Sequence, residues 1–79
     1  MIVVPPPGEF RRQYANDRDA EEHLREEYTR RREMAVFYYT LRNAKKLSRQ
    51  NGHSLEYNWR VLEAQRATSK GGGGKGSRF

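Results

Sequence analysis

Four basic residues lie at helical spacing in the middle of the chain. Arg42, Lys45, Lys46 and Arg49 recur at steps of three and four, so a helix would place them on roughly one face. Such a row of cations neutralises several phosphates of a nucleic acid, and the resulting affinity falls steeply with salt. Basic residues on a later helix and near the end of the chain are expected to extend this face. The predicted nucleic-acid contacts are Arg42, Lys45, Lys46, Arg49, Arg60, Arg66, Lys70 and Lys75.

Aromatic residues interleave with these cations. Tyr38, Tyr39, Tyr57 and Trp59 are candidates for stacking against bases, because every base offers a π-face. Trp59 and Phe37 are better explained as core residues, since a chain this small needs its largest apolar side chains inside.

Catalytic and metal-binding patterns are weak. The chain has no cysteine, and its serines do not lie in a nucleophile elbow. His23 has Glu26 and Glu27 three and four residues on, a spacing that is more typical of a charged helix face than of a metal site. The glycines at 71–74 lack the Lys-Ser/Thr pair and the following helix of a phosphate-binding loop. We therefore predict a non-enzymatic binding protein with no cofactor and no small-molecule substrate.

Binding to protein is the second hypothesis. Leu24 and Tyr28 form a narrow apolar row in a highly charged segment, and Ala35 and Tyr38 are expected to continue it. Such a row suits the groove of a partner or a dimer interface. The predicted protein contacts are Leu24, Tyr28, Ala35 and Tyr38. The protein would then be a regulator or structural subunit, of the kind that phages and other viruses encode, acting through this helix and the N-terminal arm.

Residues 17–50 contain no glycine and no proline, so the sequence predicts one long helix there. Polar residues at 16, 17 and 19 are candidate N-caps. Within this helix, residues 34–41 form an apolar box, MAVFYYTL, that is too broad for one amphipathic face and needs neighbours on two sides. A strand is the alternative for this box, because its aromatic and β-branched residues favour strands.

Asn51-Gly52 is the clearest break in the chain. Gly52 suits the left-handed position that follows a helix, and Ser54 suits the N-cap of a second helix over about 55–68. The short connection makes the two helices an antiparallel or an angled pair.

Leu55, Trp59 and Leu62 on the second helix are expected to pack against the apolar box. A DNA-reading helix-turn-helix is a weaker match to the same segment. Asn58 stands where that motif is usually apolar.

Both ends of the chain are predicted to be irregular. Residues 1–16 form a proline-rich arm, in which Ile2-Val3-Val4 either folds back on the domain or adds to the edge of a partner sheet. Residues 9–16 are expected to include a short helical turn. Residues 69–79, SKGGGGKGSRF, are expected to be a flexible basic tail.

The composition limits the size of the core. Hydrophobic residues make up 34% of the 79 residues and charged residues 33%, so a partner or self-association is expected to add stability. The net charge of +6 is uneven: residues 1–33 carry seven arginines and eight acids, and residues 34–79 carry nine basic residues and two acids. A polyanion is therefore expected to contact the second half. The chain has no apolar stretch that could span a membrane, and we expect a cytoplasmic protein.

The sequence thus predicts an all-α protein in which a long and a shorter helix form an antiparallel hairpin over 17–68. An extended arm precedes the hairpin and a disordered tail follows it. Its first predicted function is contact with nucleic acid or with a nucleic-acid-processing complex. Protein-only binding is the alternative.

Overall fold

The computed structural model describes the backbone of residues 4–72 and the side chains of residues 4–67. Over these residues the protein is all-helical, with a 3-10 turn (η1, Pro7–Glu9) and three α-helices: α1 (Asp17–Arg30), α2 (Met34–Asn51) and α3 (Leu55–Gly72). The all-α prediction is confirmed, and the alternative of a strand over 34–41 is excluded because these residues lie in α2. None of the helices in the described part of the chain is long and apolar enough to cross a membrane.

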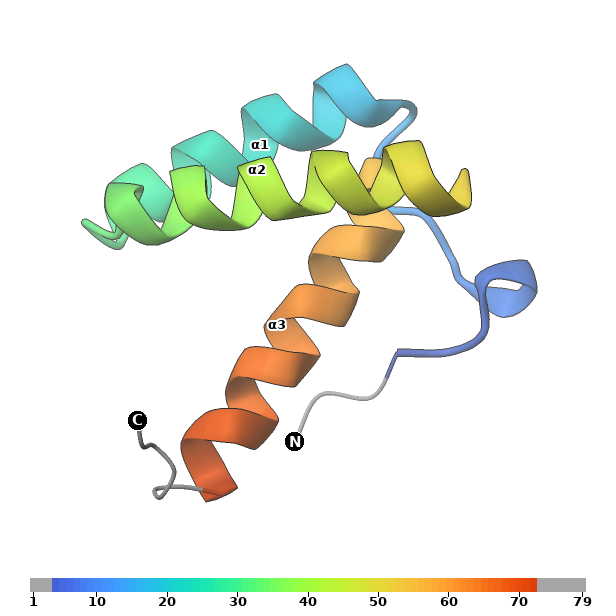
Figure 1. Ribbon diagram of the computed structural model, residues 1–79. Helices are drawn as coiled ribbons and strands as arrows, with labels where there is room; N and C mark the ends of the chain where they lie inside the picture. The colour runs from blue at the N-terminus through green and yellow to red at the C-terminus, as the bar shows by residue number, and fades with distance from the viewer. Residues whose placement is uncertain (1–3, 73–79) are drawn as a thin grey trace.

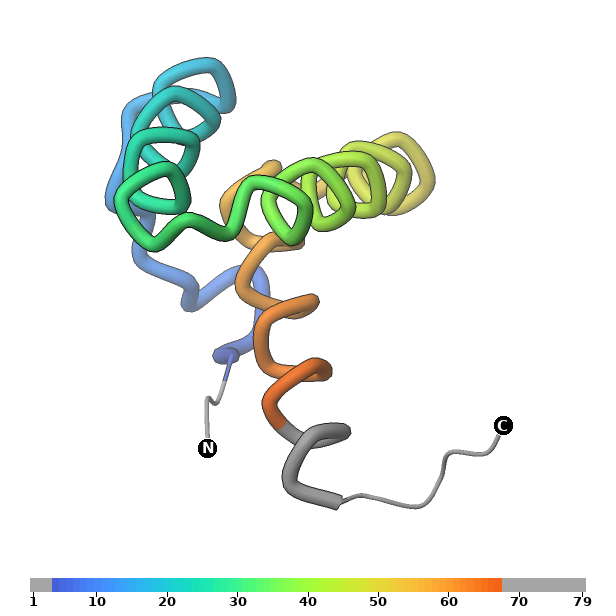
Figure 2. The backbone as a smooth tube through the Cα atoms, turned by 90° about the vertical axis from the view of Figure 1, so that its left-hand side faces the viewer, coloured from blue at the N-terminus to red at the C-terminus, as the bar shows by residue number. Residues whose placement is uncertain are grey.

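The prediction of one long helix over 17–50 is wrong. α1 ends at Arg30 and α2 begins at Met34, and the chain reverses direction between them (Figure 1). The antiparallel pair is therefore α1 with α2, and not the two helices on either side of Gly52. α3 starts beneath this pair and runs away from it at a steep angle, as Figure 2 also shows. α3 continues to Gly72, so the predicted tail begins inside a helix.

One aromatic side chain from each helix forms the centre of the core. Tyr28, Phe37 and Trp59 are each at most 1% exposed. The Trp59 ring centroid lies 5.7 Å from that of Tyr28 and 5.4 Å from that of Phe37. α1 and α3 thus give the apolar box the two neighbours that its breadth requires. The predicted packing of Leu62 and Trp59 against the box is confirmed.

The turn between α2 and α3 matches its prediction. Gly52 has a φ of 76° and donates its N–H to the Ser48 carbonyl at 2.8 Å. The Ser54 hydroxyl accepts the N–H of Tyr57 at 3.1 Å, which caps α3. Asn58 is buried, and its amide donates to the Ser48 hydroxyl at 2.9 Å. Asn58 can therefore occupy a buried position that is usually apolar, because its amide is hydrogen-bonded.

The N-terminal arm packs along α3. The carboxylate of Glu56, itself 2% exposed, accepts the backbone N–H groups of Gln13 at 2.8 Å and Tyr14 at 3.3 Å. The Phe10 ring meets the edge of Tyr57 at 5.3 Å between centroids. The helical turn predicted within 9–16 is displaced toward the N-terminus: the 3-10 turn ends at Glu9, and the N–H groups of Gln13 and Tyr14 bond to Glu56 of α3. Ile2-Val3, part of the predicted strand-forming tripeptide, lies outside the described residues.

Candidate nucleic-acid interface

The outer face of α2 gathers cations and tyrosines. Phe37, Thr40, Leu41 and Ala44 are buried at helical spacing, so the residues between them point to solvent. We call this outer surface the α2 cationic face. It comprises Tyr38, Tyr39, Arg42, Lys45, Lys46 and Arg49, all of them exposed.

The charge of this face is almost unopposed. α2 contains no aspartate or glutamate. Lys45 lies 3.5 Å from Glu21 of α1, but among the described side chains Arg42, Lys46 and Arg49 form no ion pair. Charges that lack a partner keep their full attraction for a polyanion, apart from screening by salt.

Tyr38 and Tyr39 differ in their exposure to solvent. Tyr39 is 70% exposed and Tyr38 is 52% exposed, and no other large apolar or aromatic residue in the described part of the chain is exposed to this degree. The Tyr38 ring meets the buried Phe37 ring edge-on at 5.2 Å. Tyr38 is therefore oriented by the core, whereas Tyr39 projects into solvent. Each offers an aromatic surface beside the cations.

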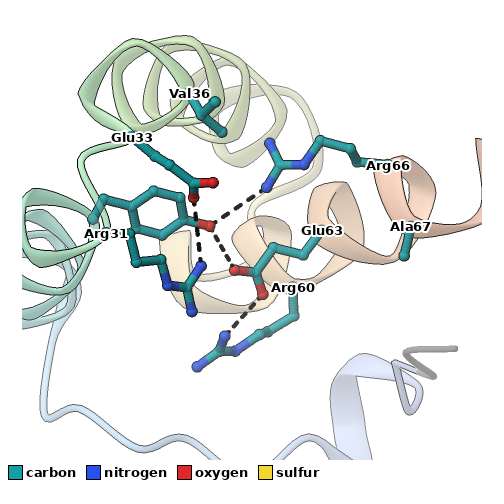
Figure 3. Close-up of a pocket in the computed structure, with 8 residues that line it drawn as sticks. Arg31, Glu33, Val36, Arg60, Glu63, Arg66 and Ala67 are labelled. Carbon is teal, nitrogen blue, oxygen red and sulfur yellow. Dashed lines mark hydrogen bonds and ion pairs between the residues drawn. The ribbon is translucent and has the colours of Figure 1, made fainter. Parts of the chain in front are cut away.

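Arg60 does not extend the α2 cationic face, and Arg66 reaches its edge beside Tyr39. Both line a cavity of about 580 Å³ between the end of α1, the start of α2 and the middle of α3 (Figure 3). Arg60 pairs with Glu63 at 2.8 Å, and Arg66 donates to the buried Thr40 hydroxyl at 3.1 Å. Arg60 therefore faces away from the predicted interface, whereas Arg66 is exposed and lines a second pocket together with Thr40 and Tyr39. The side chain of Lys70, and all of Lys75, lie outside the described residues.

Glu63 organises the polar groups of this cavity. Its carboxylate accepts from the Tyr28 hydroxyl at 2.9 Å, from the Trp59 indole N–H at 3.2 Å and from Arg60. Burial, followed by the hydrogen bond to Glu63, raises the pKa of Tyr28. Burial alone would lower the pKa of Arg60, but its hydrogen bond and charge pairing with Glu63 raise it. The cavity wall is thus a satisfied network that ties α1 to α3, and its polar groups already have partners within the chain.

Sequence reasoning missed this network because Tyr28 counts as apolar in a helical pattern. The available signal was local: Glu63 lies three residues after Arg60 and four after Trp59, within reach of both on one helix. Nothing in the sequence linked Glu63 to Tyr28, which is 35 residues away.

The predicted protein-binding row is split between the core and the surface. Leu24 and Tyr28 are each 1% exposed and belong to the core cluster. Ala35 and Tyr38 lie on the exposed side of α2, on the far side of the break. The row is therefore not a continuous surface in the folded chain.

The N-terminal end of α3, which would contact bases in a helix-turn-helix, is covered by other parts of the chain. That motif inserts the N-terminal residues of its second helix into the major groove. Here the Leu55 N–H donates to the Asp17 carboxylate at 3.1 Å, and Glu56 holds the N-terminal arm. The start of α3 is occupied by the chain itself.

No metal site forms around His23. Its ring lies 2.9 Å from the Asp19 carbonyl and stacks on Tyr14 at 5.0 Å between centroids. The hydrogen bond to that carbonyl raises the pKa of His23. Among the described residues, no group of three histidine or acidic side chains could hold a metal ion.

Comparison with known proteins gives no further guide: no family model, no curated protein and no solved structure matches this chain.

Proposed function

We propose that this protein binds nucleic acid through the α2 cationic face, without catalysing a reaction. The observation that carries the proposal is one exposed helix face with four cations and two tyrosines, on a helix that contains no acid. The cations contact phosphates, and Tyr38 and Tyr39 stack on bases.

Unpaired nucleotides suit this face better than a duplex. In a duplex the bases are stacked on one another, so Tyr38 and Tyr39 would gain little from it. A single strand offers its bases for stacking and its phosphates to the neighbouring cations. The face also lacks the protruding helix start that reads a major groove.

A salt titration tests the proposal. Affinity for a labelled single strand and for a duplex of equal length is measured by fluorescence anisotropy at several salt concentrations. Four phosphate contacts predict a log–log slope of about −3 for the single strand, since each contact contributes roughly −0.7. No binding to either nucleic acid at low salt would refute the proposal.

A matched pair of variants separates the face from the overall charge. Arg42→Glu with Lys46→Glu reverses two cations that have no ion pair among the described side chains, and the slope is expected to fall to about half. Arg11→Glu with Arg12→Glu makes the same change in net charge on the exposed arm. Equal losses in both double variants would show that binding follows net charge rather than this face.

Tyr39→Ala tests the stacking contact. The side chain is 70% exposed, so its removal leaves the core intact. Loss of one stacked base costs about 1–3 kcal/mol, which is a loss of affinity of roughly fivefold or more. An acidic protein is the competing occupant of this face, and a pull-down that retains its partner after nuclease treatment would favour it.

A further inference from the structure

The chain bends sharply between α1 and α2 with residues that do not favour a bend. The N–H of Glu33 bonds to the Tyr28 carbonyl at 2.9 Å, and the N–H of Arg32 bonds to the Thr29 carbonyl at 3.0 Å. This is the Schellman pattern, in which the residue in the left-handed region is usually glycine. Here that residue is Arg32, with a φ of 60°. A side chain at this φ strains the backbone.

The start of α2 also lacks the capping residue that usually marks the beginning of a helix. Glu33 is its N-cap, and its side chain makes no capping hydrogen bond. The other helix boundaries contrast with this one. The N-cap of α1 is Asn16, whose side chain accepts the Asp19 N–H at 2.8 Å, and the α2–α3 turn has Gly52 and Ser54 in their favoured positions.

Packing between the helices, and not the local sequence, favours the bend. Residues 17–50 contain no helix breaker, so the local sequence favours a straight helix through residues 31–33. The fold-back is stabilised by the burial of Leu24 and Tyr28 of α1 against Phe37 and Trp59. Those contacts do not require that α1 belongs to the same chain.

We propose that this protein forms a dimer by exchanging its N-terminal part with a second copy. In the dimer α1 and α2 join into one helix, and residues 4–30 of each chain pack on α2 and α3 of the other. The contacts of α1 with the core are remade between the two chains, including the Tyr28–Glu63 hydrogen bond and the contact of Glu56 with the arm, while the hydrogen bonds of the bend give way to those of a helix. The two strained bends disappear, which favours the exchange. Association costs entropy, so the dimer population rises with protein concentration.

Two substitutions of Arg32 test the exchange and remove the same charge. Arg32→Gly relaxes the bend, whereas Arg32→Ala keeps the strain and favours the straight helix. Light scattering coupled to size exclusion measures the dimer fraction of the full-length chain from micromolar to millimolar concentration. A dimer contains two straightened junctions, and at each one Arg32→Ala is favoured over Arg32→Gly by its helix preference and by the relief of its left-handed strain. The helix preference alone gives about thirtyfold, so the association constant of Arg32→Ala is expected to exceed that of Arg32→Gly by more than this factor.

Engineered cysteines distinguish an exchanged dimer from an ordinary one. The chain has no cysteine of its own, and Glu21 of α1 pairs with Lys45 of α2 at 3.5 Å. A short bismaleimide cross-linker replaces the reach of these two side chains and links the helices of the Glu21→Cys, Lys45→Cys variant. In the Arg32→Ala background, the isolated dimer is expected to give covalent dimers on a non-reducing gel, and the monomer is expected to give none. The proposal is overturned if Arg32→Ala stays monomeric throughout, or if its dimer contains only cross-links within one chain.

Discussion

Replacing Tyr28 with phenylalanine removes the hydroxyl that joins α1 to α3 by hydrogen bonds. The ring is 1% exposed, and Tyr28→Phe keeps its packing on Trp59 while removing the hydroxyl. That hydroxyl donates to the Glu63 carboxylate at 2.9 Å and accepts from Arg66 at 3.4 Å. A hydrogen bond to a charged group contributes about 1.5–3 kcal/mol. Glu63 keeps two other donors, so we expect the lower part of this range, about 1.5–2 kcal/mol.

A double-mutant cycle with Glu63→Gln measures the coupling directly. Unfolding in guanidinium chloride is followed by the fluorescence of Trp59, the only tryptophan, which is fully buried. We expect a coupling energy of about 1–2 kcal/mol between positions 28 and 63. Tyr28→Phe alone is expected to lower the melting temperature by roughly 4–8 °C for each kcal/mol lost. A coupling energy below about 0.3 kcal/mol would refute this account of the cavity wall.

The same hydrogen bond predicts a change at alkaline pH. The pKa of Tyr28 is raised in the folded state above its ordinary value of 10.0. An acid whose pKa is raised on folding stabilises the fold below its unfolded pKa, and the contribution is lost as pH rises through the folded pKa. The wild type is therefore expected to lose more stability above pH 10 than Tyr28→Phe does. Equal losses would place the hydroxyl in solvent.

Two further substitutions test the connections at the start of α3. Glu56→Gln is expected to cost about 1–3 kcal/mol, because two backbone N–H groups of the arm lose a charged acceptor, and faster cleavage by trypsin after Arg12 would report the released arm. Gly52→Ala is expected to cost about 1 kcal/mol by thermal unfolding, since a Cβ meets no atom there and only the φ of 76° is unfavourable. A neutral Gly52→Ala would show that the turn relaxes out of the left-handed region.

The helix boundaries show what the sequence could and could not predict. The α2–α3 turn was predictable because Gly52 and Ser54 are local signals for it. The α1–α2 bend was not, because residues 31–33 give no local signal and Arg32 even opposes it. Burying Leu24 and Tyr28 contributes about 1.5–3 kcal/mol each, against a strain of roughly 1–2 kcal/mol at Arg32. Tertiary packing therefore outweighs the local strain, and that packing depends on Trp59 of α3, which lies far from the bend in the sequence.

The candidate interface also contains residues whose position could be predicted from the sequence and residues whose position could not. The placement of Arg42, Lys46 and Arg49 on one exposed face followed from their spacing alone, because the buried positions of α2 alternate with them. Arg60 and Arg66 have the same charge and a helical location, but Glu63 and Thr40 hold them at the cavity. Which cations face solvent depends on how the helices pack, and spacing does not determine it.

The fold-back also decides which surface is left for a partner. A single straight helix over 17–50 would leave the apolar box short of neighbours and the row at Leu24 and Tyr28 free to bind protein. In the folded structure the apolar residues of α1 pack against the apolar box, so both surfaces are buried together. What remains exposed and aromatic in the described part of the chain is Tyr38 and Tyr39, beside the cations of α2. A partner that uses this surface must match both positive charge and flat rings, and an unpaired stretch of nucleic acid does so with its phosphates and bases.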